Sequence, residues 1–208
     1  MKITVFGSGV VGQALASKFS QLGHEVVMAT RDPEATSQRT EPNPQSGISF
    51  ASWHAKNQEV QLVAFDEVSG NQNLYVNATG GVYSLEILKS AGAGTLSGNI
   101  LLDVGNPLDF SQGWPPSLAI CNTDSLGEKI QREFPDCRVV KCLNTLNYQV
   151  MVAPDMVPGD HQVFMSGEDA KAKEMVAGLL SEIGWDRERV IDLGGIRTAR
   201  GTEMMMPM

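Results

Sequence analysis

The sequence predicts an α/β fold built on a doubly wound, mainly parallel sheet. Short runs rich in β-forming residues alternate with amphipathic helical windows almost to the end of the chain, which is typical of a parallel sheet with covering helices. A glycine-rich turn follows the first of these runs. With 208 residues, of which 42% are apolar and 19% charged, the chain has the composition of a globular protein with one sizeable core.

Strands and helices are expected in alternation along the chain. We expect strands near residues 2–6, 25–29, 60–64, 74–78, 99–104, 138–143, 162–166 and 189–193, where apolar and β-branched residues cluster. The helical windows are 10–22, a short piece near 33–38, and then 48–57, 82–91, 123–134 and 169–183. For the helix in 123–134, Thr123 or Asp124 is the expected N-terminal cap.

Two long segments have the composition of loops. Segment 40–47, TEPNPQSG, holds two prolines and a glycine and is expected at the surface. Segment 105–117, GNPLDFSQGWPPS, begins where a predicted strand ends. In doubly wound sheets the ligand crevice lies beyond the carboxyl ends of the strands. The second loop is therefore a candidate wall of a ligand site.

The glycine turn lies in the stretch VFGSGVVGQALA, residues 5–16, directly after an apolar strand and at the start of a helix. Its spacing matches G-x-G-x-x-G. Gly7 would permit the tight turn, Gly9 would let the backbone approach a pyrophosphate, and Gly12 would let the helix pack on the strand. The helix N-terminus would face the phosphates with unpaired N–H groups. We therefore expect a Rossmann-type dinucleotide-binding domain over residues 1–143, with a small C-terminal α/β extension, 144–208, packed on it.

The end of the second strand, ATRDP, bears on which dinucleotide is bound. An NAD site usually places Asp or Glu about 20 residues beyond the turn, whereas an NADP site has an Arg nearby. Arg31 stands 19 residues after Gly12 and is preceded by Thr30. A guanidinium can bind phosphate oxygens in pairs, and the hydroxyl can donate another bond. NADP(H) is the prediction. Two alternatives stay open: a small register shift would let Asp32 bind the ribose, or these residues merely cap a helix at Pro33.

Composition and charge exclude several other classes of function. The formal net charge of -8 is unfavourable for a general nucleic-acid or anionic-membrane surface. No apolar run approaches the roughly 20 residues of a membrane span, and no cationic signal region precedes the first strand, so a cytoplasmic location is expected. Cys121, Cys137 and Cys142 form no C-x-x-C pair, and the three histidines form no ligand pattern. We expect reduced thiols and no metal site.

The chain resembles the NADPH-dependent coenzyme F420 reductase family, also called F420H2:NADP oxidoreductases, and the related cytosolic domain of STEAP metalloreductases. The resemblance covers nearly the whole chain and rests on FGSGVVGQALA, ATRDP, ILLDVGNPLDF, RVVKCLNTLNYQV and IDLGGIRTARGTE. It implies that the pyrophosphate and 2′-phosphate are held near the N-terminus and the nicotinamide near later turns. The implied residues are Gly7, Ser8, Gly9, Val10 and Val11 for the pyrophosphate, Thr30 and Arg31 for the 2′-phosphate, Asn77, Ala78 and Thr79 along the cofactor, and Asn106, Asn144 and Thr145 near the nicotinamide.

Two departures from the family bear on the second substrate. F420 reductases commonly have a proline and an aromatic residue after the fourth strand, where this chain has Thr79-Gly80-Gly81. The family would also continue the closing segment as a C-terminal helix beyond Met208. The resemblance implies a deazaflavin such as F420, or a flavin, as a small-molecule redox co-substrate. We also expect a homodimer, because a partner subunit could cover the ligand crevice that one chain leaves half open.

The expected chemistry is hydride transfer between two ring cofactors, for which the protein mainly supplies alignment and excludes water. No catalytic acid or base is therefore predicted. Lys141 is unexpected in the apolar run Val139 to Leu143. It could pair with a carboxylate, or it could donate a proton in a small carbonyl or imine reductase. A non-catalytic NADP(H)-binding redox sensor is a further alternative.

Overall fold

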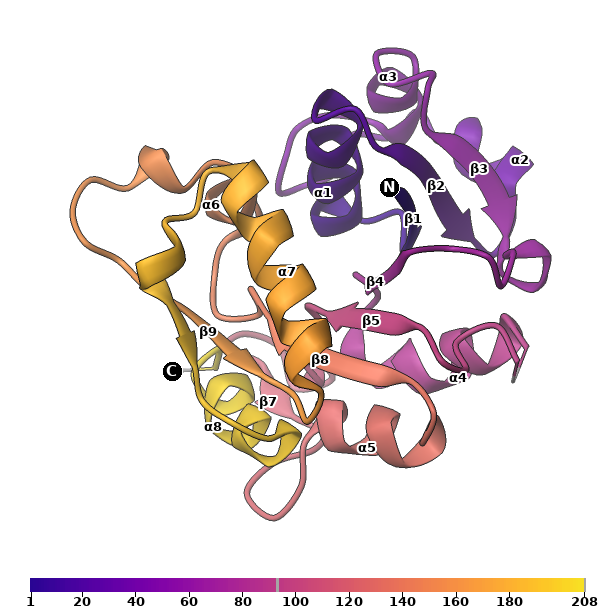
Figure 1. Ribbon diagram of the computed structural model, residues 1–208. Coiled ribbons are helices and arrows are strands. Elements are labelled where there is room, and N and C mark those ends of the chain that lie inside the picture. Colours follow the sequence, from indigo (N-terminus) through magenta and orange to yellow (C-terminus); the bar gives the residue numbers. More distant parts are fainter. Residues whose placement is uncertain (93, 208) are drawn as a thin grey trace.

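An eight-stranded sheet forms the centre of the molecule in the computed structural model, which describes residues 1–92 and 94–207 (Figure 1). The strand order is β10-β9-β8-β5-β4-β1-β2-β3. The strands are β1 (Lys2–Phe6), β2 (Glu25–Thr30), β3 (Gln61–Ala64), β4 (Leu74–Asn77), β5 (Ile100–Asp103), β8 (Arg138–Cys142), β9 (Val163–Ser166) and β10 (Val190–Asp192). Every predicted strand is present, and each boundary lies within one residue of its expected position.

Neighbouring strands of this sheet run parallel, except for one pair. β8 and β9 are antiparallel, with Lys141 opposite Ser166 and Cys142 opposite Met165. β10 then returns parallel to β9. The predicted fold class, a Rossmann-type and mainly parallel sheet, is confirmed. Residues 144–208 add β9 and β10 to the same sheet; the domain boundary at residue 143 stays a prediction.

The helices cover both faces of the sheet (Figure 1). They are α1 (Val10–Gln21), α2 (Pro33–Ser37), α3 (Phe50–His54), α4 (Ser84–Ser90), α5 (Leu126–Glu133), α6 (Tyr148–Val152), α7 (Ala170–Ile183) and α8 (Ala199–Met204). Short 3-10 turns add η1 (Phe65–Glu67), η2 (Gly81–Tyr83), η3 (Pro154–Met156), η4 (Arg187–Arg189) and η5 (Ile196–Thr198). The fifth helical window is shorter than expected, because Ser125 and neither Thr123 nor Asp124 accepts the capping bond from the Glu128 amide, at 3.1 Å.

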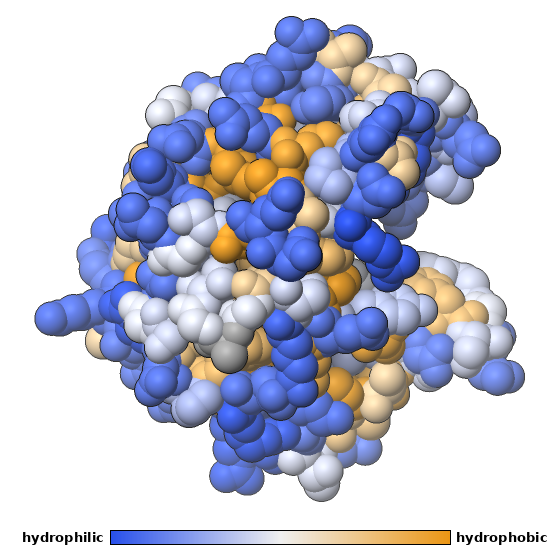
Figure 2. Space-filling model, turned by 90° about the vertical axis from the view of Figure 1, so that its right-hand side faces the viewer, coloured by the Kyte–Doolittle hydropathy of each residue, from blue (hydrophilic) through white to orange (hydrophobic). Residues whose placement is uncertain are grey.

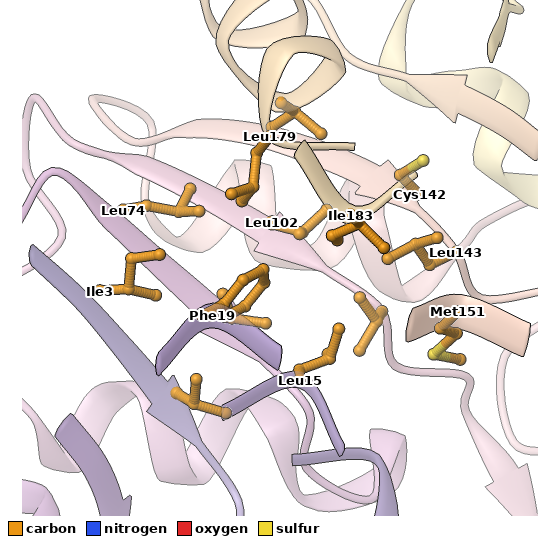
Figure 3. Close-up of a cluster of buried hydrophobic side chains, with 14 of the residues drawn as sticks. Ile3, Leu15, Phe19, Leu74, Leu102, Cys142, Leu143, Met151, Leu179 and Ile183 are labelled. Atoms are coloured by element: carbon orange, nitrogen blue, oxygen red, sulfur yellow. The ribbon is translucent and has the colours of Figure 1, made fainter. Parts of the chain in front are cut away.

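Alternate side chains of the central strands point into two separate cores. One core joins Ile3, Leu74 and Leu102 to residues of α1, α6 and α7, including Phe19 and Ile183 (Figure 3). The other joins the intervening strand residues to α4, α5 and α8; its sheet members are Phe6, Ala29, Tyr75, Leu101 and Val139. Since both faces are covered, the strands read as almost continuous apolar runs, which is why their limits could be predicted closely.

Segment 105–117 holds a small element that the sequence did not indicate. Two-residue strands β6 (Leu108–Asp109) and β7 (Ser117–Leu118) pair antiparallel within this long connection. The hairpin carries Phe110 and Trp114, whose rings stack with centroids 6.5 Å apart and are 56% and 84% exposed. Strands of two residues carry too little periodicity to be recognised in a sequence.

The face of the molecule in Figure 2 is mostly hydrophilic, with smaller apolar areas between. Within residues 1–92 and 94–207, no helix combines the length and hydrophobicity needed to cross a membrane. The same residues contain no group of His, Cys, Asp and Glu arranged for a metal ion. The three cysteines are free, and burial raises the pKa of Cys137 and of Cys142 to about 12, so both remain protonated thiols.

Candidate functional site

The glycine turn between β1 and α1 has the geometry of a phosphate cradle. Gly7 has a φ of +108°, and a Cβ atom at Gly12 would lie only 2.0 Å from the Gly7 carbonyl oxygen. A Cβ at Gly9 would meet no atom within 4 Å, so space lies open above this peptide. Gly9 is also the N-cap of α1, with no side-chain cap and no acidic residue in the first turn. Unpaired N–H groups and the positive helix end therefore face open space that an anion can fill.

Two hollows adjoin each other beside the glycine turn. Both are lined by Ala78, Thr79 and Gly80, which form the turn after β4. The smaller hollow, of about 320 Å³, lies at the carboxyl end of β2. It is lined by Gly7, Ser8, Gly9, Thr30, Arg31, Thr36, Arg39, Phe65, Ala78, Thr79, Gly80 and Ile87. The larger hollow, a cleft of about 670 Å³, extends from the start of α1 past the predicted loop wall to α6. Because they share the turn after β4, one extended ligand can occupy both.

A cationic corner lines the smaller hollow, as the sequence predicted for a 2′-phosphate. Arg31 is exposed there, and in the described part of the chain it makes no ion pair or hydrogen bond. Thr30 is buried beside it, with its hydroxyl 2.8 Å from that of Thr36. Asp32 caps α2 by accepting a 2.9 Å bond from the Ala35 amide. Asp32 therefore caps the short helix, as one of the alternatives held, while the Arg31 guanidinium remains available for an anion.

Arg39 is a second cation at this corner, and it was missed from the sequence. Its guanidinium donates a 2.7 Å hydrogen bond to Ser8 Oγ in the glycine turn and lies 4.9 Å from the centre of the Phe50 ring. Partial burial lowers the pKa of Arg39, although an arginine keeps its charge in proteins. No spacing rule connects a residue after α2 with the first turn of the fold. The hollow thus holds two arginines, where one was expected.

The cleft end of the site is built from neutral amides. Asn106 Nδ2 donates to the Asn144 carbonyl oxygen at 2.6 Å, and Asn144 Nδ2 donates to Asn106 Oδ1 at 2.9 Å. A Cβ atom at Gly81 would lie 2.0 Å from the Asn106 carbonyl oxygen. The Thr79-Gly80-Gly81 departure therefore has a structural reason: the turn after β4 closes directly on the turn after β5, and only glycine fits at that contact.

Most of the predicted site residues line one of the two hollows, and three do not. Val10, Val11, Ala78, Thr79, Asn106 and Asn144 line the cleft, while Gly7, Ser8, Gly9, Thr30 and Arg31 line the smaller hollow. Gly12 is buried beneath the turn, and Thr145 belongs to neither lining. Asn77 is fully buried and also lies outside both linings, and its place along the cofactor stays a prediction. Asn77 Oδ1 accepts bonds from the Thr79 amide, at 3.3 Å, and hydroxyl, at 2.7 Å.

Lys141 lies in a buried cluster and does not line the cleft. Its ammonium is 2.6 Å from Asp103 Oδ2, 2.8 Å from Glu203 Oε1 and 2.7 Å from the Gly105 carbonyl oxygen. The three side chains are at most 1% exposed. Burial alone would lower the pKa of Lys141, but the two carboxylates raise it above its usual value. Because its ammonium is engaged by buried acceptors and the side chain does not line the cleft, Lys141 is not placed to donate a proton there, and the pairing alternative is the one found.

The cleft offers few groups for acid–base chemistry. Among the described lining residues, only Tyr83, Asp109 and Tyr148 are titratable, and none is cationic. The amide and then the hydroxyl of Ser111 lower the pKa of Asp109, which therefore stays ionised at neutral pH. The rim is apolar and open, with Tyr83 60% and Phe110 56% exposed. Such a lining suits a flat ring better than a substrate that needs a proton donor.

Known proteins resemble this chain over its whole length. The sequence profile described as NADP oxidoreductase, coenzyme F420-dependent, matches residues 2–107. A crystal structure from Arthrobacter sp. FB24, provisionally named an F420-dependent NADP-reductase, is 52% identical, with a TM-score of 0.92, covering 100% of this chain and 90% of its own. A Streptomyces aurantiacus imine reductase is 17% identical with a TM-score of 0.62, covering 99% of this chain and 59% of its own, and shows the fold alone.

A curated relative, metalloreductase STEAP3 of Rattus norvegicus, is 28% identical over 204 residues, which is 97% of this chain. This chain spans only 36% of that relative's length. The profile match covers more than half of the chain and includes the glycine turn, the cationic corner and Asn106. The chain is therefore an NADP(H)-binding oxidoreductase that belongs to the coenzyme F420-dependent NADP oxidoreductase family.

Proposed function

We propose that this protein transfers a hydride between NADP(H) and a planar deazaflavin or flavin-type acceptor, with F420 as the first candidate. The observation that carries the proposal is the pair of connected hollows. One has a phosphate cradle and two arginines, and the other has neutral amides and an apolar rim. The family description and the provisional name of the Arthrobacter protein support F420 as the partner.

The residues present fit NADP(H), whose nicotinamide supplies the hydride chemistry when it is bound. The N–H groups at the start of α1 would hold the pyrophosphate over Gly9, where the structure leaves open space. Arg31 and Thr30 would bind the 2′-phosphate, and Arg39 would add a second charge. Asn106 and Asn144 would border the ring, held in place by their reciprocal hydrogen bonds.

The acceptor would lie along the rim of the cleft formed by Val82, Tyr83, Phe110 and Met206. When bound, NADPH would supply a hydride, that is two electrons and one proton, to the acceptor ring, which would take up one further proton from the solvent. The protein then needs to align two rings and exclude water, and no side chain has to donate a proton. The lining is consistent with that requirement, since its carboxylate, Asp109, stays ionised.

The test is NADPH oxidation by the purified protein with a panel of F420, FMN, FAD, a quinone, a cyclic imine and a ketone. We expect oxidation with at least one ring acceptor, and fastest with F420. Phe110→Ala should raise the KM for that acceptor severalfold while leaving the Kd for NADPH unchanged. Met156→Ala is the matched control, because Met156 is 59% exposed but lies outside both hollows.

A carbonyl or imine reductase, or a sensor, would give a different result. A carbonyl or imine reductase needs a proton donor beside the hydride path, and Tyr148 is one of the tyrosines that line the cleft. Turnover with only the imine or the ketone, abolished by Tyr148→Phe with NADPH affinity retained, would replace the ring-to-ring proposal. Tight NADPH binding without any acceptor-dependent oxidation would favour a sensor instead.

We also propose that a second copy of the chain covers the open side of the cleft in a homodimer. Exposed apolar side chains at the rim, Val82, Tyr83, Phe110 and Met206, support this arrangement. The mass in solution, measured by light scattering for the native protein and for Phe110→Asp, tests it. A native protein that remains monomeric at micromolar concentration contradicts the dimer.

A further inference from the structure

The Asp103–Lys141–Glu203 cluster combines two carboxylates with one ammonium in the interior. Each side chain is at most 1% exposed, and Lys141 Nζ lies within 2.8 Å of an oxygen of both acids. The cluster therefore carries a formal charge of -1, from two negative groups and one positive group. Glu203 also accepts bonds from the Leu126 and Gly127 amides at 2.8 and 3.0 Å, so the positive end of α5 balances part of this charge.

A single residue, Gly105, lies between the cluster and the cleft. Gly105, which lines the cleft, donates its amide to Asp103 Oδ1 at 3.1 Å and accepts from Lys141 Nζ at 2.7 Å. The next residue, Asn106, belongs to the reciprocal amide pair at the ring end. No lysine, arginine or histidine is among the described residues that line the cleft, and the carboxylate of Asp109 is. No cationic side chain in the described lining therefore offsets a negative field from behind Gly105.

We propose that the Asp103–Lys141–Glu203 cluster makes the ring end of the site favour the oxidised, positively charged nicotinamide over the reduced, neutral one. This inference rests on the proposed function, because that function places the nicotinamide beside Asn106. A buried charge acts across a low-dielectric interior and is weakly screened, so it stabilises a nearby cation more than it would in water. Glu203 is then a positioning residue that sets the relative affinity for the two cofactor forms from the C-terminal helix α8.

The experiment measures the Kd of NADP⁺ and of NADPH for the native protein and for Glu203→Gln. Removal of one negative charge should weaken NADP⁺ binding about tenfold relative to NADPH, the order expected for a unit charge near a buried site. For a two-electron couple this ratio equals a rise of about 30 mV in the potential of the bound cofactor. Glu203→Asp keeps the charge and should leave the ratio near the native value.

Glu128→Gln is the matched control. Glu128 also joins α5 to α8, through two bonds to Arg200 at 2.6 and 2.7 Å, but it lies outside the cluster. A merely structural role for Glu203 would alter both affinities together and leave their ratio unchanged in every variant, and that result would overturn the inference. If Glu203→Gln does not fold, Asp103→Asn removes a charge from the cluster on the side of Gly105 and should shift the ratio in the same direction.

The native protein supplies a test without any substitution, because it should bind NADP⁺ more tightly than NADPH. A Kd for NADP⁺ tenfold above that for NADPH would reject the inference even if neither variant folds. Failure of the proposed function gives a different result, since the native protein would then bind neither form or would oxidise NADPH with no ring acceptor. An unchanged ratio together with normal F420 turnover would reject the cluster's role alone.

Discussion

The two ends of the site are built in opposite ways. The phosphate end consists of backbone amides, an open space over Gly9 and the exposed guanidinium of Arg31. The ring end consists of turns that buried side chains support from behind. Asp103 accepts a hydrogen bond from the Gly105 amide, and Lys141 donates one to the Gly105 carbonyl oxygen. The first end can select a ligand by charge, whereas the second can keep two rings in a fixed relation.

This difference predicts how each end responds to change. Interactions at an exposed phosphate site are screened by salt and depend on single cations. A buried network depends on all of its members, because removal of one leaves another charge without a partner. Substitutions at the phosphate end should therefore alter affinity with little loss of stability, and substitutions behind the ring end should do the reverse.

Substitution of Gly12 should have the largest effect on cofactor binding, since the added Cβ of Gly12→Ala would lie 2.0 Å from the Gly7 carbonyl oxygen. The turn has to move, and we expect the Kd for NADPH to rise at least about 100-fold, a loss of roughly 3 kcal/mol of binding free energy. Fluorescence titration measures it. Gly178→Ala in α7 is the control, because a Cβ there meets nothing within 4 Å; equal losses in both variants would contradict the role of the turn.

Lys141→Met should cost about 3–5 kcal/mol of unfolding free energy, because it leaves two buried carboxylates without their cation. Urea denaturation measures this loss. Lys89→Met is the comparison: its ion pair with Glu133 lies at the surface, where such pairs contribute under about 1 kcal/mol. A fully stable Lys141→Met protein that binds NADPH but does not turn over would instead restore Lys141 as a proton donor.

Arg31→Ala should weaken NADPH binding roughly 30-fold, or about 2 kcal/mol, and change NADH binding less than about twofold. The fold should be unaffected, because the guanidinium is exposed and makes no ion pair within residues 1–92 and 94–207. Titrations at low and high salt should show the NADPH preference shrinking as salt screens the charge. Arg187→Ala, on η4, controls for the loss of a surface cation. Equal losses for both cofactors would falsify the assignment.

The smallest effect concerns pH and the contact between α5 and α8. Hydrogen bonds from Arg200 hold the pKa of Glu128 below its usual value, so this carboxylate stabilises the fold above that value and loses its contribution as pH falls through the lowered pKa. Glu128→Gln should therefore cost under about 1 kcal/mol at neutral pH and nothing in strong acid. Thermal unfolding from pH 7 to 3 compares the two proteins; a constant difference contradicts this coupling.

Local patterns in the sequence were enough for much of the fold and for one end of the site. Apolar runs located the eight strands, and the spacing between Gly12 and Arg31 placed the guanidinium on the smaller hollow. Thr30 and Arg31 follow the glycine turn at a fixed distance, because the turn and these two residues belong to one βαβ unit. Their encounter depends on short-range geometry, which a sequence pattern can express.

Contacts between distant segments could not be predicted in the same way. Arg39 reaches Ser8 across 31 positions, and the Glu203 carboxylate meets the Leu126 amide across 77. Lys141 was recognisable as unusual in an apolar strand, but its partners depend on how α8 packs against α5 and β8. Asn77 likewise donates hydrogen bonds inside the protein to Asp103 and Ser84, and the sequence did not indicate these contacts.

Selection of the 2′-phosphate by the cationic corner is the central claim, and fragments of the cofactor test it most directly. Calorimetric titration of the native protein with 2′,5′-ADP and with 5′-AMP compares two ligands that differ only in the 2′-phosphate and that both lack the nicotinamide. We expect 2′,5′-ADP to bind at least about tenfold more tightly, with the advantage lost in Arg31→Ala. Equal affinities for the two fragments in the native protein would contradict the account.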